Sequence, residues 1–306
     1  MCMRRCSSFR MADTAHGVCA HGVCALSVCA RGAVVIVALL SLASSLASSL
    51  AAQAPRTRSM DDLNWMEFAE LVPARVRTVI LTVGTLEPHG VANNGADNTA
   101  PVAIARAIMG DAGINALLAP HLPYGVTGSM APYPGALTIP EEAYRPYIRA
   151  VLEGLAKNKF RDIIIINGHG GPQTAILNEV AREVSLERGV NTLVINWWSL
   201  TADISRAVFG SDGGHAGVNE TAFIQATDPS LVRRERYTGP DMATANPAPG
   251  AWSAVPFPSA ITLYQPGSGW PTDFDQAKAE RYQRDVIARV RDLVAETIAK
   301  WKRAGF

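Results

Sequence analysis

Cysteine is missing from most of this sequence. The chain has 306 residues, and its cysteines all precede residue 30: Cys2, Cys6, Cys19, Cys24 and Cys29. The rest of the chain therefore has no disulfide, no thiol nucleophile and no thiolate metal ligand. Three of the cysteines lie in a degenerate repeat, HGVCA-HGVCA-LSVCA, which is typical of a low-complexity leader.

An excess of charge of either sign is missing as well. Beyond the first 54 residues the sequence contains 24 basic and 26 acidic residues. A near-neutral domain without a basic stripe is not expected to bind nucleic acid. The hydrolase motifs G-x-S-x-G and H-E-x-x-H are also absent, so the sequence gives no support to those two classes of hydrolase.

The first 54 residues have the pattern of a secretory signal peptide. Arginines precede an apolar run over residues 33–40, and small residues follow it at Ala51 and Ala52. The alternative is an uncleaved membrane anchor. We therefore expect a leader at residues 1–54 and one domain at residues 55–306, secreted or periplasmic, without stable membrane contact once the leader is removed.

The domain alternates short aliphatic runs with amphipathic segments, which favours a mainly parallel sheet in a three-layer α/β/α sandwich. We expect strands at residues 78–83, 116–119, 162–166 and 192–196. We expect helices at residues 99–109, 141–156, 173–187, 219–226 and 275–301. A Pro/Gly/Ala-rich stretch after Tyr237 is expected to be a long loop.

Polar residues stand directly after two of these strands. Glu87 and His89 follow the first, with Asp97 shortly beyond, and His169 follows the third within NGHGG. The carboxyl ends of parallel strands form the ligand crevice of such folds, so these side chains are expected to meet. Glu, His and Asp together are ligands for Zn²⁺, Mn²⁺ or Fe²⁺.

A third polar stretch reads GGHAGVNET. It places His215 and Glu220 around the start of a predicted helix, where Glu220 could instead simply complement the helix dipole. Of the four histidines beyond the leader, His121 is the one interpreted as structural or pocket-lining. Trp197 and Trp198 could line the pocket, belong to the core or contact another subunit.

Together, GTLEPHG…D, NGHGGP and HAGVNET resemble the three motifs of the creatininase (creatinine amidohydrolase) family, in the same order. The resemblance extends over about residues 60 to 300, with weaker similarity at LPYGVTG and YPGALTI. It implies a creatininase-like α/β/α fold and a metal-dependent amidohydrolase.

The resemblance also implies roles for individual residues. Glu87, His89, Asp97 and His169 would bind two divalent ions (Zn, Mn or Fe), with Asp97 between them. Glu220 would be the fifth ligand, because Gly171 stands where creatininase itself has a glutamate. His215 would handle the proton of the leaving nitrogen. Two such ions can activate a shared water as a bridging hydroxide for attack on an amide carbonyl.

The chain departs from the family pattern at several points. The interval from His89 to Asp97 is one residue short, which leaves open whether Asp97 bridges both ions. Ser129, Met130 and Pro172 also replace residues common in the family. The resemblance therefore does not imply that creatinine itself is the substrate. The resemblance further implies a small-molecule amide substrate, cyclic amides included, and a homo-oligomer such as a hexamer.

Two alternatives remain open, the first because related branches of the family act on peptides or formamides. A metallopeptidase or deformylase would keep the metal chemistry and change the substrate. A secreted binding protein would keep the fold with a degenerate site, an alternative motivated by the altered residues Ser129, Met130 and Pro172.

Overall fold

The computed structural model describes residues 55–236, 255–256 and 275–306. These residues belong to one compact unit, Pro55–Phe306. The predicted leader and almost all of the loop predicted after Tyr237 lie outside the described residues. Within the part that the structure describes, no helix has the length and apolar character needed to cross a membrane.

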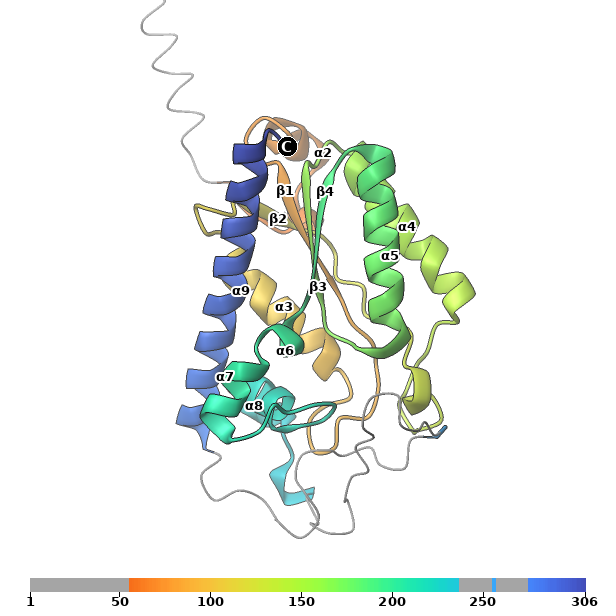
Figure 1. The fold of residues 1–306 in the computed structure, drawn as a ribbon, viewed down its shortest axis with the longest axis vertical. Helices are drawn as coiled ribbons and strands as arrows, with labels where there is room; N and C mark the ends of the chain where they lie inside the picture. Colours follow the sequence, from red (N-terminus) through yellow and green to blue (C-terminus); the bar gives the residue numbers. More distant parts are fainter. Residues whose placement is uncertain (1–54, 237–254, 257–274) are drawn as a thin grey trace, which may run out of the picture. The chain divides into compact units, whose positions relative to one another are not determined.

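A parallel sheet of four strands forms the centre of the domain (Figure 1). Its strands, β1 (Thr78–Val83), β2 (Ala116–Leu118), β3 (Asp162–Asn167) and β4 (Asn191–Asn196), lie in the order β2-β1-β3-β4. All residues of β1 and β3 are buried, as expected for central strands covered on both faces. Val83 pairs with Asn167, which pairs with Asn196, so three strands end side by side at one edge.

Helices cover both faces of this sheet. Figure 1 shows α4 and α5 on one face and α3 and α9 on the other. The helices are α2 (Trp65–Leu71), α3 (Ala96–Ile108), α4 (Glu141–Lys157), α5 (Gly171–Arg188), α6 (Trp197–Leu200), α7 (Ala202–Phe209), α8 (Val218–Thr227) and α9 (Gln276–Ala304). Short 3₁₀ helices occur at η1 (Met60–Asp62), η2 (Gly128–Met130), η3 (Pro229–Leu231) and η4 (Arg234–Arg236). The three-layer α/β/α architecture is therefore confirmed.

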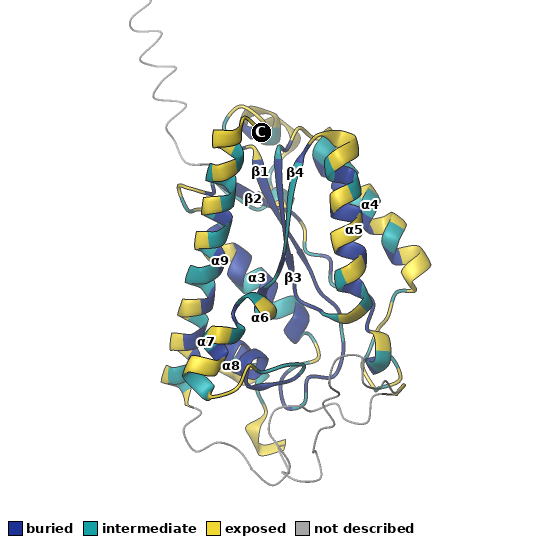
Figure 2. Ribbon diagram, in the orientation of Figure 1, coloured by how far each residue is buried: buried dark blue, intermediate teal, exposed yellow. Residues whose placement is uncertain are grey.

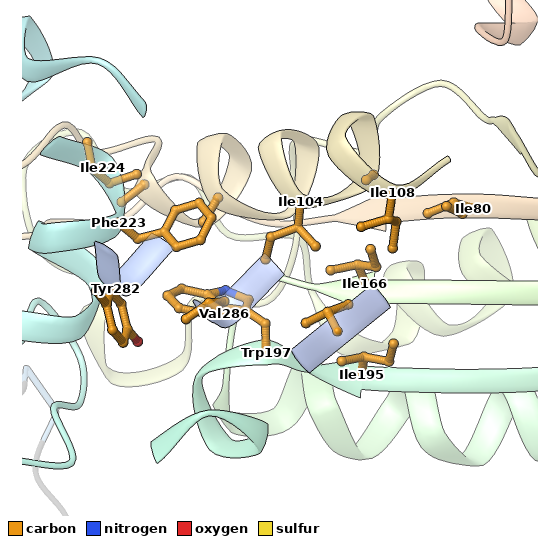
Figure 3. Close-up of a cluster of buried hydrophobic side chains, with 14 of the residues drawn as sticks. Ile80, Ile104, Ile108, Ile166, Ile195, Trp197, Phe223, Ile224, Tyr282 and Val286 are labelled. Carbon is orange, nitrogen blue, oxygen red and sulfur yellow. The ribbon is translucent and has the colours of Figure 1, made fainter. Parts of the chain in front are cut away.

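Each face of the sheet has its own hydrophobic core. One core joins Ile80 and Ile166 of the sheet to α3, α8 and α9, and it contains Trp197 and Tyr282 (Figure 3). The other joins the opposite side of the same strands to α4 and α5. Figure 2 shows buried residues along the strands and exposed ones on the outward sides of α5 and α9. These two cores hold the strand ends in fixed positions.

The predicted elements differ from the observed ones mainly at their ends. Helix α3 begins at Ala96, three residues before the expected start, so Asp97 lies in the first helical turn and not in a loop. The polar residues of that turn have no helical apolar spacing, which is why pattern alone places the start too late. Helices α2, α6 and α7 were not predicted, because each has only four to eight residues, too few for a helical period to be recognised in the sequence.

Candidate metal centre

The six side chains singled out in the sequence lie together beyond the carboxyl ends of the strands. Glu87 and His89 belong to the segment after β1, and His169 follows β3 directly. Asp97 lies in the first turn of α3, while His215 precedes α8 and Glu220 belongs to its first turn. All are buried except His215, whose side chain is 25% exposed. Four separate segments of the chain therefore build one cluster.

Two glycines let α3 come close enough to the sheet to place Asp97. A Cβ atom on Gly168 would lie 1.9 Å from the carbonyl oxygen of Asp97, and one on Gly84 would lie 2.3 Å from it. Any side chain at either position would collide with backbone, which cannot move aside as a flexible side chain can. The first turn of α3 therefore lies between the ends of β1 and β3 only because both strands are followed by glycine.

A first group of possible metal ligands consists of Glu87, Asp97 and His169. The Nδ1 atom of His169 lies 3.0 Å from Oε1 of Glu87 and 3.0 Å from Oδ2 of Asp97. Two carboxylate oxygens and one imidazole nitrogen form a donor set that suits a divalent transition metal.

A second group consists of His89, Asp97 and Glu220. The Nε2 atom of His89 lies 3.0 Å from Oδ1 of Asp97 and 3.4 Å from Oε2 of Glu220. Its Nδ1 atom lies 3.0 Å from the carbonyl oxygen of Glu87 and can only donate to it, so Nε2 is the ring nitrogen that faces the two carboxylates. Asp97 thus contributes one carboxylate oxygen to each group, and the short interval after His89 does not prevent this placement.

His215 lies beside both groups. Its Nδ1 atom is 3.1 Å from Oε1 of Glu87, and its ring centroid is 4.7 Å from that of His89. With Glu87 and His89 it forms a third possible ligand group. The geometry therefore allows His215 either to bind metal or to carry a proton next to it. The residue after it, Ala216, has φ 49°, a left-handed backbone that is uncommon for a residue with a side chain.

The cluster concentrates negative charge in a buried space. Burial by itself lowers the pKa of His89 and of His169, but the carboxylates around them raise both pKa values to about 10. Burial raises the pKa of Glu220 to about 7, and the nearby Asp97 adds to the effect. The two histidines outweigh burial at Asp97 and hold its pKa well below the usual range. Three carboxylates buried together favour bound positive charge.

Several buried polar atoms of the cluster have no hydrogen-bond partner among the described residues. They include both carboxylate oxygens of Glu87 and the Nε2 atoms of His89, His169 and His215. Close contacts such as His89 Nε2 to Asp97 lack hydrogen-bonding geometry. Buried polar atoms normally have hydrogen-bond partners. Buried atoms that lack them and lie close together are free to bind a metal ion. The residues present therefore fit bound divalent metal.

Five residues of the cluster line a cavity of about 330 Å³. Besides Glu87, Asp97, His169, His215 and Glu220, the described lining consists of Thr127, Gly128, Ser129, Met130, Gly168, Gly170, Gly171, Pro172, Trp198 and Gly214. The two neighbouring tryptophans separate here: Trp198 lines the cavity, while Trp197 is 1% exposed and packs in the core against Phe223.

Sequence reasoning did not single out Thr127. Its side chain is buried beside the cavity, and Oγ1 lacks a hydrogen-bond partner among the described residues. Thr127 belongs to LPYGVTG, whose similarity to the family was weak, so only its position in that segment could have indicated it. His121 does not line the cavity; its ring contacts Thr82 and Asn98 instead.

A parallel α/β/α fold with a buried cluster of carboxylates and histidines at its ligand crevice defines a metal-dependent hydrolase. The model of the creatininase family (creatinine amidohydrolase) matches residues 61–294. A creatinine amidohydrolase of Pseudomonas putida is 26% identical over 205 residues, which cover 61% of this chain and 78% of the relative.

Solved structures agree on the fold. A crystal structure of creatinine amidohydrolase (creatininase) has a TM-score of 0.67 and 22% identity, covering 79% of this chain and 98% of that one. A mutant creatininase described as the Zn–Zn type gives a TM-score of 0.64 and 22% identity, covering 79% and 99%. The chain belongs to the creatininase family, and it is a metal-dependent amidohydrolase.

Proposed function

We propose that this enzyme hydrolyses the C–N bond of small non-peptide amides, cyclic amides included, at a site holding two divalent ions. Glu87, Asp97 and His169 would hold one ion, and His89, Asp97 and Glu220 the other. The observation that carries the proposal is that Asp97 directs one carboxylate oxygen at each group, 3.0 Å from a histidine nitrogen on either side. Related creatininases have been solved in forms described as Zn–Zn and Mn, which supports zinc or manganese here.

Two bound ions would lower the pKa of water and polarise an amide carbonyl. The protein supplies the proton for the leaving nitrogen, and we assign this role to His215. Its Nδ1 atom lies against the carboxylate of Glu87, which orients the ring, while Nε2 has no hydrogen-bond partner among the described residues. His215 is also the most exposed member of the cluster and lines the cavity, where a substrate nitrogen can reach it.

The cavity supports a small and uncharged substrate. Its volume of about 330 Å³ is near the lower limit for ligand pockets. Apart from the cluster, its described lining contributes no charged side chain, only glycine backbone, hydroxyls, Met130, Pro172 and Trp198. A flat amide ring can lie against the indole of Trp198, whereas a charged group would find no opposite charge outside the cluster.

The first test is the metal content of the purified protein, with Asp97→Asn beside wild type. We expect about two equivalents of Zn or Mn per chain in wild type and a clear loss in the variant. Asp162→Asn is the matched control, because Asp162 is a buried acid at the opposite end of β3 and should leave metal content unchanged. Folded wild-type protein that takes up no metal would contradict the proposal.

The second test separates substrate classes. Metal-loaded enzyme is offered creatinine and other cyclic amides, formamides and short peptides, and product is measured for each. Hydrolysis of the cyclic amides supports the proposal. Preference for formamides or peptides would instead make the protein a deformylase or metallopeptidase, and metal binding without any turnover would favour a binding protein.

The role of His215 can be tested independently. His215→Gln should keep two equivalents of metal and lose about 10²- to 10⁴-fold in kcat, as expected for a group that only transfers a proton. Loss of one metal equivalent in this variant would make His215 a ligand instead.

We also propose that the protein is exported and self-associates. The basic and apolar pattern of residues 1–54 supports export through a cleaved signal peptide. Amino-terminal sequencing of the extracellular or periplasmic protein should begin after Ala51 or Ala52. Family membership supports a homo-oligomer such as a hexamer, and light scattering of the purified protein measures its mass.

A further inference from the structure

His121 belongs to a hydrogen-bonded chain of three side chains next to the metal centre. Its Nδ1 atom lies 2.8 Å from the hydroxyl of Thr82, and its Nε2 atom lies 2.9 Å from Oδ1 of Asn98. The Nδ2 atom of Asn98 donates to the carbonyl oxygen of Pro123 at 3.3 Å, so its Oδ1 atom is the one that faces His121. In the tautomer that fits these two contacts, the ring donates from Nε2 and accepts at Nδ1 from the Thr82 hydroxyl. Nδ1 also lies 3.1 Å from the backbone carbonyl oxygen of Thr82, which accepts from Leu122 N.

Each member of this chain comes from a different segment around the site. Thr82 is near the end of β1, which leads to Glu87 and His89. His121 follows β2 in the loop that runs beside the end of β1, where Leu122 N donates to Thr82 O and Gly84 N donates to Leu122 O. Asn98 directly follows Asp97 in the first turn of α3. The three side chains thus connect the strand leading to two ligands with the helix that carries a third.

The surroundings leave Asn98 little freedom. Thr82 is fully buried, and burial lowers the pKa of His121 to about 4, which keeps the ring neutral at pH 7 with one donor and one acceptor. A Cβ atom on Gly84 would lie 2.3 Å from Oδ1 of Asn98, so the amide packs directly on the end of β1. A shift of Asn98 would therefore shift Asp97, whose carboxylate is shared by both ligand groups.

We infer that His121 is a positioning residue of the metal centre: by linking Asn98 to Thr82, it sets where the carboxylate of Asp97 lies between the two groups of ligands. The inference rests on the proposed function, because it takes Asp97 to be a ligand. Among the described residues, the hydrogen bonds of the His121 ring are to Thr82 and Asn98 and not to the cluster, so it acts through Asn98.

The test measures metal affinity and does not depend on turnover. Zn²⁺ binding to chelator-treated protein is measured by calorimetry for wild type, His121→Leu, Thr82→Val and His121→Gln. Loss of an interaction that orients a ligand typically weakens metal binding 10- to 100-fold, and we expect this for His121→Leu and Thr82→Val. Glutamine can supply one donor and one acceptor at this position, so His121→Gln should bind Zn²⁺ within about threefold of wild type.

Asn191→Ala separates positioning from a general loss of stability. Asn191 donates to Oδ1 of Asp162 at 2.7 Å, at the opposite end of the sheet. Removing this hydrogen bond should lower the Tm, as we expect for the other variants too, but it should leave the Zn²⁺ affinity unchanged. Wild-type affinity in both His121→Leu and Thr82→Val would overturn the inference, and Thr82→Val alone decides if His121→Leu does not fold. Wild-type protein that binds no Zn²⁺ would overturn the proposed function as well.

Discussion

At the scale of single residues, the histidines of this chain differ in pKa because their surroundings differ. His89 and His169 lie among carboxylates, which raise the pKa of each to about 10. His121 lies away from these charges, and burial lowers its pKa to about 4. The difference comes from neighbours that are far apart in the sequence, so residue type alone does not reveal it.

The low pKa of His121 makes acid destabilise the fold. In the unfolded chain a histidine binds a proton below about pH 6.5, whereas folded His121 does so only below about pH 4. Unfolding therefore takes up a proton between these values, and the free energy of unfolding falls as the pH falls. Relative to His121→Gln, chelator-treated wild type should lose about 2–3 kcal/mol between pH 7 and pH 4. Urea unfolding at each pH measures the difference, and parallel curves for the two proteins would contradict it.

At the scale of elements, the site depends on how closely α3 approaches β1 and β3. The amino-terminal turn of α3 lies against two positions without side chains, Gly84 and Gly168. In the sequence, both glycines stand within a few residues of predicted ligands. The sequence does not show that the first turn of α3 packs against them. The approach is a property of three elements together, and it brings Asp97 between the other proposed ligands.

Gly168→Ala should therefore destabilise the protein and impair metal binding together. Its Cβ atom would lie 1.9 Å from the carbonyl oxygen of Asp97, so α3 must move away from the sheet. We expect a loss of about 1–3 kcal/mol or more in urea unfolding, as is usual for overpacking. The control is Gly154→Ala in α4, where nothing lies within 4 Å of the added carbon. It should stabilise by about 0.5–1 kcal/mol, and a similar loss in both variants would contradict the role given to Gly168.

At the scale of the whole molecule, metal binding and folding should be coupled. The proposed ligands come from segments that meet only in the folded chain, so the unfolded chain has no comparable site. Free Zn²⁺ at 100 times the dissociation constant should add about 2.7 kcal/mol per site to the free energy of unfolding.

This coupling can be measured by urea unfolding at buffered Zn²⁺ concentrations. Wild type and Asp162→Asn should gain stability equally, whereas Asp97→Asn should gain little, because Asp97 belongs to both proposed ion sites. An equal gain in all three proteins would mean that Zn²⁺ stabilises the fold from somewhere else.

Much of this organisation could be predicted from the sequence. The aliphatic runs identify all four strands of the described sheet, because buried parallel strands have a continuous apolar pattern. The three glycine-flanked histidines, two of them with a glutamate nearby, indicate the cluster and the family, because ligand chemistry is a property of residue types. The short length of α2, α6 and α7 hides these helices, and the polar first turn of α3 makes its predicted start three residues late.

The sequence by itself determined the fold class, the family and the six polar residues that meet at the crevice. Only the tertiary structure decided that Asp97 lies between two ligand groups, that Trp198 faces the cavity while Trp197 packs in the core, and that His121 holds Asn98. The physical reason is that local patterns report which side chains are buried and what they can bind. Distances between them arise only when the two cores fix the strands and helices against one another.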